Sequence, residues 1–188
     1  MPRQGKPKRR KRRKQPDLRG EIKNRVDIAL RPVIVALRTR LGDWEADLVC
    51  GASHSGYLIT LVDRTSRVTL IGYSKTKHAI NVTSEIMKLL KNKVVKTITF
   101  DNGKEFAGHE MIAQGLDCNC YFAKPYRSWE RGTNENTNGL LCQYFPKKTL
   151  FDNITFEQIA FAQNRLNTRP RKCLAFRPPN LVHYGLAA

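Results

Sequence analysis

The sequence predicts an α/β fold, a mixed five-stranded sheet with helices on both faces. Two β-rich runs, residues 57–62 and 68–73, flank a turn-like segment and predict a hairpin. The strand-like stretch around Trp44 extends this hairpin to an antiparallel meander, after which helix-like and strand-like segments alternate. A meander followed by alternating units is typical of a mixed sheet covered on both sides.

The alternating part begins with an amphipathic helix over residues 77–91, predicted from an apolar stripe at three-to-four residue spacing: Ile80, Thr83, Ile86, Met87 and Leu90. The expected order then continues with a strand, a short helix, a strand and two longer helices, at residues 97–100, 109–114, 120–123, about 128–144 and 156–167. Ahead of the meander, Val33 to Val35 is expected to form a short strand after Pro32.

Composition predicts one domain with a tail. The chain has 188 residues, 40% of them hydrophobic, which is enough for one good core. We expect residues 1–40 to form a basic disordered arm and linker and residues 41–188 to form the folded domain. No apolar run is long enough to span a bilayer, and no signal peptide is evident, so we expect a cytoplasmic protein without membrane contact.

Charge indicates the partner. The formal net charge is +18, and residues 1–16 carry nine positive charges and no acid. Three interpretations of this arm remain open: contact with phosphates or a linker between domains, a nuclear-localisation signal, or a solubilising tail. The remaining chain is also basic, and positive surfaces hold nucleic-acid backbones, so DNA is the expected partner.

Three acidic residues lie in contexts that suit an active site. Asp47 lies in a strand-like stretch, Asp101 ends an apolar run, and Glu135 lies on the expected helix over 128–144. Carboxylates from separate elements can hold Mg²⁺ or Mn²⁺ ions, and a pair of such ions clamps both oxygens of an in-line displacement at a phosphodiester. Asp43 and Glu45 share the strand face of Asp47, so spacing alone does not select among the three.

Four segments carry a family resemblance: residues 42–47 (GDWEAD), 99–106 (TFDNGKEF), 125–139 (PYRSWERGTNENTNG) and 166–174 (LNTRPRKCL). Together they resemble the catalytic core of bacterial insertion-sequence transposases of the IS-thirty family. The resemblance implies a ribonuclease-H-like fold of the retroviral-integrase type. It also implies that Asp47, Asp101 and Glu135 match the metal-binding catalytic triad.

What the resemblance implies about activity is DNA transposition. Two Mg²⁺ or Mn²⁺ ions would support hydrolysis at the transposon ends and then strand transfer into target DNA. We expect DNA contacts from residues near the triad: Lys104, Arg127, Arg131, Asn134 and Asn138. The family also implies a homo-oligomer on DNA and a bacterial, nucleoid-associated location.

Two departures from the family pattern keep other functions open. Family members carry helix-turn-helix domains ahead of the core, and we expect this chain to lack them. Cys142 stands where the family commonly has Arg. An impaired transposase that binds DNA or a partner as a regulator is therefore the alternative. A stand-alone ribonuclease-H-like repair nuclease would explain the triad but not the match over residues 125–139.

Overall fold

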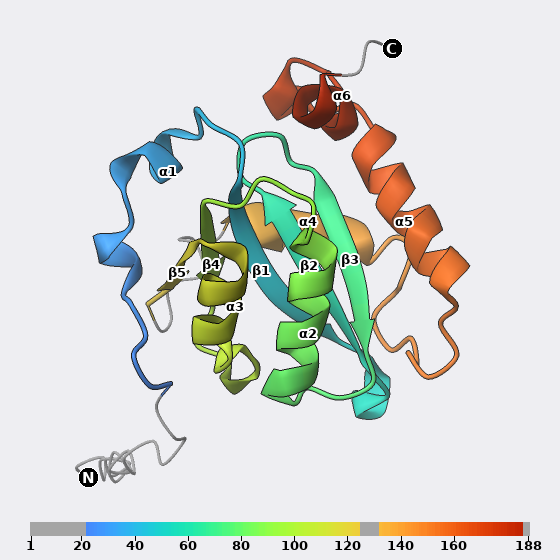
Figure 1. Ribbon diagram of the computed structural model, residues 1–188. Coiled ribbons are helices and arrows are strands. Elements are labelled where there is room, and N and C mark those ends of the chain that lie inside the picture. The colour runs from blue at the N-terminus through green and yellow to red at the C-terminus, as the bar shows by residue number, and fades with distance from the viewer. Residues whose placement is uncertain (1–21, 125–131, 186–188) are drawn as a thin grey trace, which may run out of the picture.

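A five-stranded mixed sheet forms the centre of the protein (Figure 1). The computed structural model describes residues 22–124 and 132–185. The sheet has the order β3-β2-β1-β4-β5, and its strands are β1 (Asp43–Cys50), β2 (Tyr57–Asp63), β3 (Thr69–Ser74), β4 (Thr97–Phe100) and β5 (Asn119–Phe122). The first three strands are antiparallel, whereas β1, β4 and β5 are parallel. The sequence-based fold class is confirmed.

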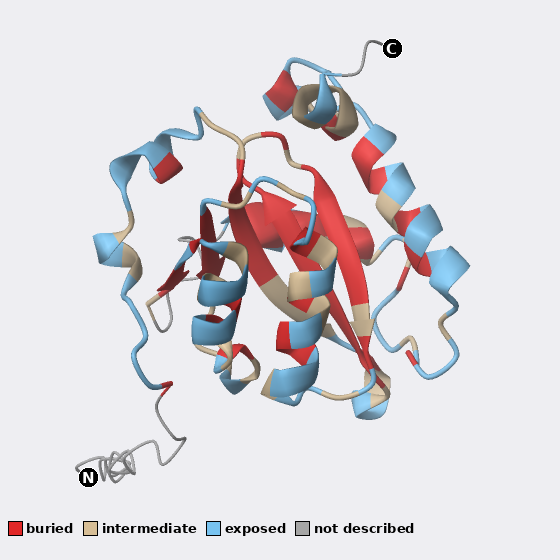
Figure 2. Cartoon of the chain, in the orientation of Figure 1, coloured by how far each residue is buried: buried red, intermediate tan, exposed pale blue. Residues whose placement is uncertain are grey.

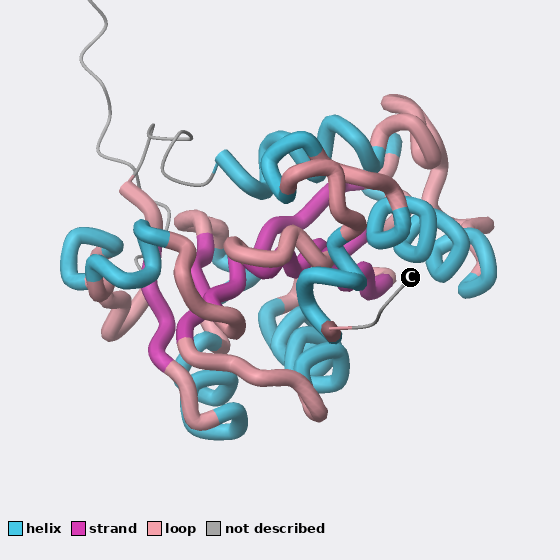
Figure 3. Tube along the Cα trace, turned by 90° about the horizontal axis from the view of Figure 1, so that it is seen from above, coloured by secondary structure: helices cyan, strands magenta, loops and turns pink. Residues whose placement is uncertain are grey.

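Helices cover both faces of this sheet (Figures 1 and 3). Helices α2 (Ala79–Leu90) and α3 (His109–Leu116) pack on one face, where Val82, Ile86 and Ile112 join a core that includes Trp44. Helices α4 (Gly132–Leu141) and α5 (Phe156–Thr168) bury Leu141 and Leu166 on the other face. The sheet between the two layers is largely buried (Figure 2).

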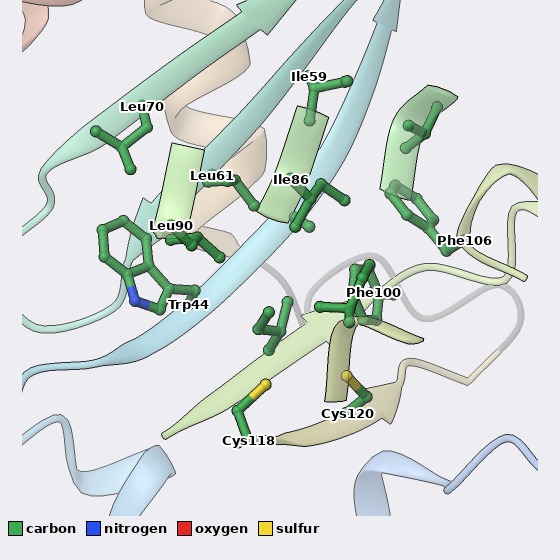
Figure 4. Packing of buried hydrophobic residues seen from close by; sticks show 14 of the residues in the cluster. Trp44, Ile59, Leu61, Leu70, Ile86, Leu90, Phe100, Phe106, Cys118 and Cys120 are labelled. Atoms are coloured by element: carbon green, nitrogen blue, oxygen red, sulfur yellow. The ribbon is translucent and has the colours of Figure 1, made fainter. Parts of the chain in front are cut away.

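Strand β1 lies at the centre of the sheet, and its side chains alternate between the two layers. Trp44 and Ala46 belong to the core under α2 and α3, and Figure 4 shows Trp44 packed near Leu61 and Leu90. Glu45 and Asp47 point the opposite way and contact α4. This alternation puts the acidic residues of β1 beneath a single helix.

Residues 22–40 run along the β5 edge of the sheet. Asp27 forms a parallel bridge with Phe122, and Arg31 donates a hydrogen bond to the Thr99 hydroxyl at 2.9 Å. The sequence grouped these residues with the arm, and a domain boundary at residue 40 stays a prediction. Among residues 22–124 and 132–185, no helix is both long and apolar enough to cross a bilayer.

Two local predictions are wrong. Residues 33–35, expected as a strand, lie in the helix α1 (Val33–Leu37). Among residues 22–124 and 132–185 no strand pairs with them, and Val35 is buried against the end of the hairpin, where its carbonyl accepts from Arg64. In α2, Ile80 is 72% exposed, whereas Val82 is fully buried. The predicted apolar stripe of α2 was therefore rotated by a fraction of a turn from the helix face that packs on the sheet.

Several short elements complete the chain. A last helix, α6 (Pro179–Tyr184), was not expected from the sequence. The 3₁₀ turns are η1 (Ile28–Leu30), η2 (Ala52–His54), η3 (Lys104–Phe106) and η5 (Lys172–Leu174). His183 of α6 shares a 2.8 Å hydrogen bond with the Ser66 hydroxyl, which connects α6 to the turn between β2 and β3.

Candidate active site

The parallel pairing of β1 with β4 brings two of the predicted acids level with each other. Asp43 pairs with Thr97 and Glu45 with Thr99, so the register, continued two residues further, puts Asp47 beside Asp101. Asp101 follows directly after β4, at the carboxyl end of the strand. The two aspartates therefore lie level with each other just beyond the paired residues of β1 and β4.

The three acids of β1 differ in what surrounds them. Asp43 is buried and accepts two hydrogen bonds from the Arg40 guanidinium, at 2.9 and 3.0 Å. Glu45 is fully buried, forms an ion pair with the buried Arg64, and accepts from the backbone N–H of Asn134 at 3.1 Å. Asp47 is half-buried and reaches the surface. The structure thus separates two structural acids from one accessible acid, which the spacing alone did not.

Helix α4 positions the Asp47 carboxylate. The Asn138 amide donates to Asp47 Oδ2 at 2.8 Å, and its carbonyl oxygen accepts from the hydroxyl of buried Thr60 at 3.3 Å. Four helix residues advance about 6 Å and two strand residues about 6.6 Å. Asn134 and Asn138 on α4 therefore have nearly the same spacing as Glu45 and Asp47 on β1, so each asparagine can contact one acid. Sequence reasoning expected Asn138 to contact DNA, which stays a prediction, and it missed Thr60, which lies on a different strand.

A tight loop fixes Asp101 and adds a further carboxylate. Asp101 Oδ1 accepts from the Gly103 N–H at 2.8 Å, and the Asn102 amide donates to the Ala123 carbonyl. The pKa of Glu105 is raised, first by burial and then by the negative charges of Asp101 and Asp47, although its own backbone N–H and Lys77 act in the other direction. Negative charge therefore accumulates here. Sequence reasoning missed Glu105, although it lies in the same TFDNGKEF block as Asp101.

The remaining predicted residues are placed differently. Glu135 is exposed on α4, and across residues 22–124 and 132–185 no three His, Cys, Asp or Glu side chains form a group that could hold a metal ion. Lys104 is exposed in η3. Asn134 is 1% exposed, and its side-chain amide has no hydrogen-bond partner, so it faces the interior rather than solvent. Arg127 and Arg131 lie outside the described residues.

Comparison with known proteins finds relatives among insertion-sequence transposases. The chain is 49% identical over 164 residues to the transposase for insertion sequence element IS4351 of Bacteroides fragilis, covering 86% of this chain and 50% of that protein. It is 40% identical over 154 residues to the transposase InsI for insertion sequence element IS30A of Escherichia coli K12, covering 80% of this chain and 40% of that protein. The chain thus spans about half or less of the length of these relatives. No family model matches.

Solved structures of retroviral integrases share the fold. The catalytic core domain of BIV integrase superposes with a TM-score of 0.60 at 19% identity, covering 76% of this chain and 93% of that one. A chain of the simian T-cell lymphotropic virus intasome, in complex with a PP2A regulatory subunit, gives a TM-score of 0.62 at 20% identity, covering 76% of this chain and 54% of that one. The ribonuclease-H-like, integrase-type fold expected from the sequence is confirmed.

Proposed function

We propose that this chain carries out DNA transposition. It is homologous to insertion-sequence transposases over about half of their length, and it has the fold of an integrase catalytic core. It would hydrolyse the phosphodiester at a transposon end and direct the freed 3′-hydroxyl at a target phosphodiester. The observation that carries this proposal is the pair Asp47 and Asp101, level at adjoining parallel strands and accessible, while Asp43 and Glu45 are buried and paired.

The donor set at this edge fits Mg²⁺ or Mn²⁺. Hard divalent cations take carboxylate oxygens, and the carboxylates of Asp101 and Asp47 lie close enough to Glu105 to add to the effect of burial in raising its pKa. We propose that Asp47, Asp101 and Glu135 hold the metal. Two bound ions would stabilise charge on the attacking and leaving oxygens of the displacement. Glu135 does not complete a group of ligands in the present arrangement, so the proposal requires it to approach the two aspartates.

The chain's own residues orient these carboxylates. Thr60 and Asn138 together fix one oxygen of Asp47, and the Gly103 N–H holds one oxygen of Asp101. Lys104 is exposed near Asp101 and is proposed to contact the DNA backbone, as are Arg127 and Arg131. Asn134 is buried, so in this arrangement its role is structural: its backbone N–H donates to Glu45.

A nicking assay tests the proposal. Supercoiled plasmid carrying transposon ends is incubated with the protein and MgCl₂, MnCl₂ or EDTA. We expect nicking with either cation and none with EDTA, and we expect Asp101→Asn and Glu135→Gln to abolish it. Asp152→Asn removes an exposed acid from the loop between α4 and α5 and serves as the control. If Glu135→Gln cuts at the wild-type rate, Glu135 does not belong to the site.

A second function is supported by the position of Glu135. Because the described residues form no three-ligand group, a chain that binds DNA or a partner without cutting would also fit the geometry. Under this alternative the protein binds DNA as described below, and nicking is absent in every metal.

A further inference from the structure

A cationic cavity of about 580 Å³ lies on another flank of α4, lined by this helix from Gly132 to Leu140 and by the segment after α5. Its lining includes five positively charged side chains from distant parts of the chain: Arg38, Arg67, Arg169, Arg171 and Lys172. No carboxylate is found among the described residues that line it. The site described above does not use this cavity.

The arginines of the cavity are held in place by neutral groups. The hydroxyl of Thr133 accepts from Arg67 at 2.9 Å and from Arg38 at 3.5 Å. Arg171 donates to the Leu166 carbonyl at 2.9 Å, while its Nε is buried without a hydrogen-bond partner. Within residues 22–124 and 132–185, none of the five cations forms an ion pair with a carboxylate.

The electrostatics agree with this geometry. The pKa of Arg38 is lowered by burial and then by the neighbouring charges of Arg67 and Arg64. The pKa of Arg171 is lowered by burial and then by Arg169. Glu45 acts on the pKa of Arg38 in the other direction, but the net shift is downward. Neighbouring like charges repel each other, and a bound anion would relieve that repulsion. Arginine guanidinium groups present paired donors that match the oxygens of a phosphate.

We propose that this cavity binds phosphodiesters of the DNA backbone, an inference that rests on the proposed function. Thr133 and Leu140 of α4 line the cavity, whereas Asn138, on another side of the same helix, contacts Asp47. A helix with its side chains is about 10–12 Å across. Backbone bound in the cavity would therefore lie across α4 from the scissile phosphodiester at Asp47 and Asp101. The cavity would thereby set which bond reaches Asp47 and Asp101.

Salt-dependent binding tests the cavity directly. Arg169 and Lys172 are exposed, so the double variant Arg169→Gln/Lys172→Gln should fold normally. The matched control is Lys88→Gln/Lys91→Gln, which removes two exposed lysines, one near the end of α2 and paired with Glu85 and one just after the helix, on the opposite face of the sheet. The dissociation constant of a labelled duplex is measured against NaCl concentration for each protein. We expect the slope of log K against log[NaCl] to fall by about 0.9–1.8 for the cavity variant, because each phosphate contact contributes about 0.9. We expect an almost unchanged slope for the control. Equal slopes for the two variants would overturn the inference.

Cys173 provides a second measurement in the unaltered protein. Its side chain lines the cavity and is exposed, so iodoacetamide should alkylate it. We expect saturating duplex at low salt to slow this alkylation at least five-fold, and 1 M NaCl to restore it. Unchanged alkylation of Cys173 in the DNA complex would overturn the inference. Protection by a polyglutamate peptide but not by duplex would also overturn it and assign the cavity to an acidic protein partner.

The failure of this inference is distinct from that of the proposed function. If the wild type nicks plasmid but the cavity variant binds DNA with the wild-type slope, the inference alone fails. If both Cys173 and the salt slope respond as expected but no metal supports nicking, the cavity stands as a backbone site and the catalytic proposal fails.

Discussion

The start and the middle of β1 (Asp43–Cys50) carry the same kind of side chain with opposite neighbours. At its start, Asp43 and Glu45 are buried and meet the guanidinium groups of Arg40 and Arg64. Further along, Asp47 is half-buried, lies beside Asp101, and adds to the negative charge that raises the pKa of Glu105. An acid with a matched cation contributes to structure, whereas carboxylates that gather at one accessible place are candidates for holding a cation.

The largest effect is expected on nicking activity, for a change at Asp47 in the middle of β1. Asp47→Asn should lower the nicking rate by about 10³-fold or more, because bound metal contributes several kcal/mol to transition-state stabilisation. Its unfolding free energy should stay the same or rise slightly, since one of several neighbouring negative charges is removed. Nicking assays paired with urea denaturation measure both. An Asp47→Asn protein that cuts normally would contradict the distinction between a functional Asp47 and the structural acids Asp43 and Glu45.

The largest effect on stability is expected at the start of β1, where Glu45 is buried against Arg64. Arg64→Ala should lower the unfolding free energy by about 3–5 kcal/mol, because Glu45 would remain buried without its cation. The double variant Glu45→Gln/Arg64→Met should recover part of this loss, since the uncompensated charge is gone. Urea denaturation curves provide the comparison. Wild-type stability in Arg64→Ala would show that the ion pair is not structural.

A smaller, mixed effect is expected at Thr60, whose hydroxyl contacts Asn138 and thereby Asp47. Thr60→Val keeps the shape and removes the hydrogen bond, so it should cost about 1 kcal/mol of stability. Activity should fall about ten-fold in kcat with little change in KM, as for a residue that positions a carboxylate. Thr65→Val removes a hydroxyl that donates to the Arg40 carbonyl, and it should change stability alone. A drop confined to KM for Thr60→Val would point to DNA binding instead.

The smallest effect is expected in the pH dependence of thermal stability, through His183 of α6. Burial lowers the pKa of His183, with Lys93 acting in the same direction and Asp63 opposing it. A histidine held neutral in the folded state stabilises fully above its unfolded pKa, about 6.5, and that stability is lost as the pH falls below this value. The melting temperature should therefore drop between about pH 7 and pH 5. His183→Gln should lessen the drop; an unchanged pH profile would contradict this assignment.

The sequence by itself determined most of the architecture, because its signals were local. Alternating β-rich runs on either side of a polar turn specify the hairpin β2–β3, and the apolar run that ends at Phe100 specifies β4. The TFDNGKEF block fixed the position of Asp101 after that strand, and the spacing of polar residues put Asn138 on the helix of Glu135. Patterns of a few residues contain this information, since strand and helix periods are set by the backbone.

The tertiary structure decided what depends on residues far apart in the chain. Asp43, Glu45 and Asp47 follow the same strand period, and only the approach of Arg40, Arg64 and α4 distinguishes their roles. Val33 to Val35 contains strand-forming residues, but no strand of the described part of the chain pairs with it, and it forms a helix. The cationic cavity joins residues near positions 38, 67, 133 and 170. Burial, ion pairing and like-charge repulsion depend on distances in space, and the fold alone sets these distances.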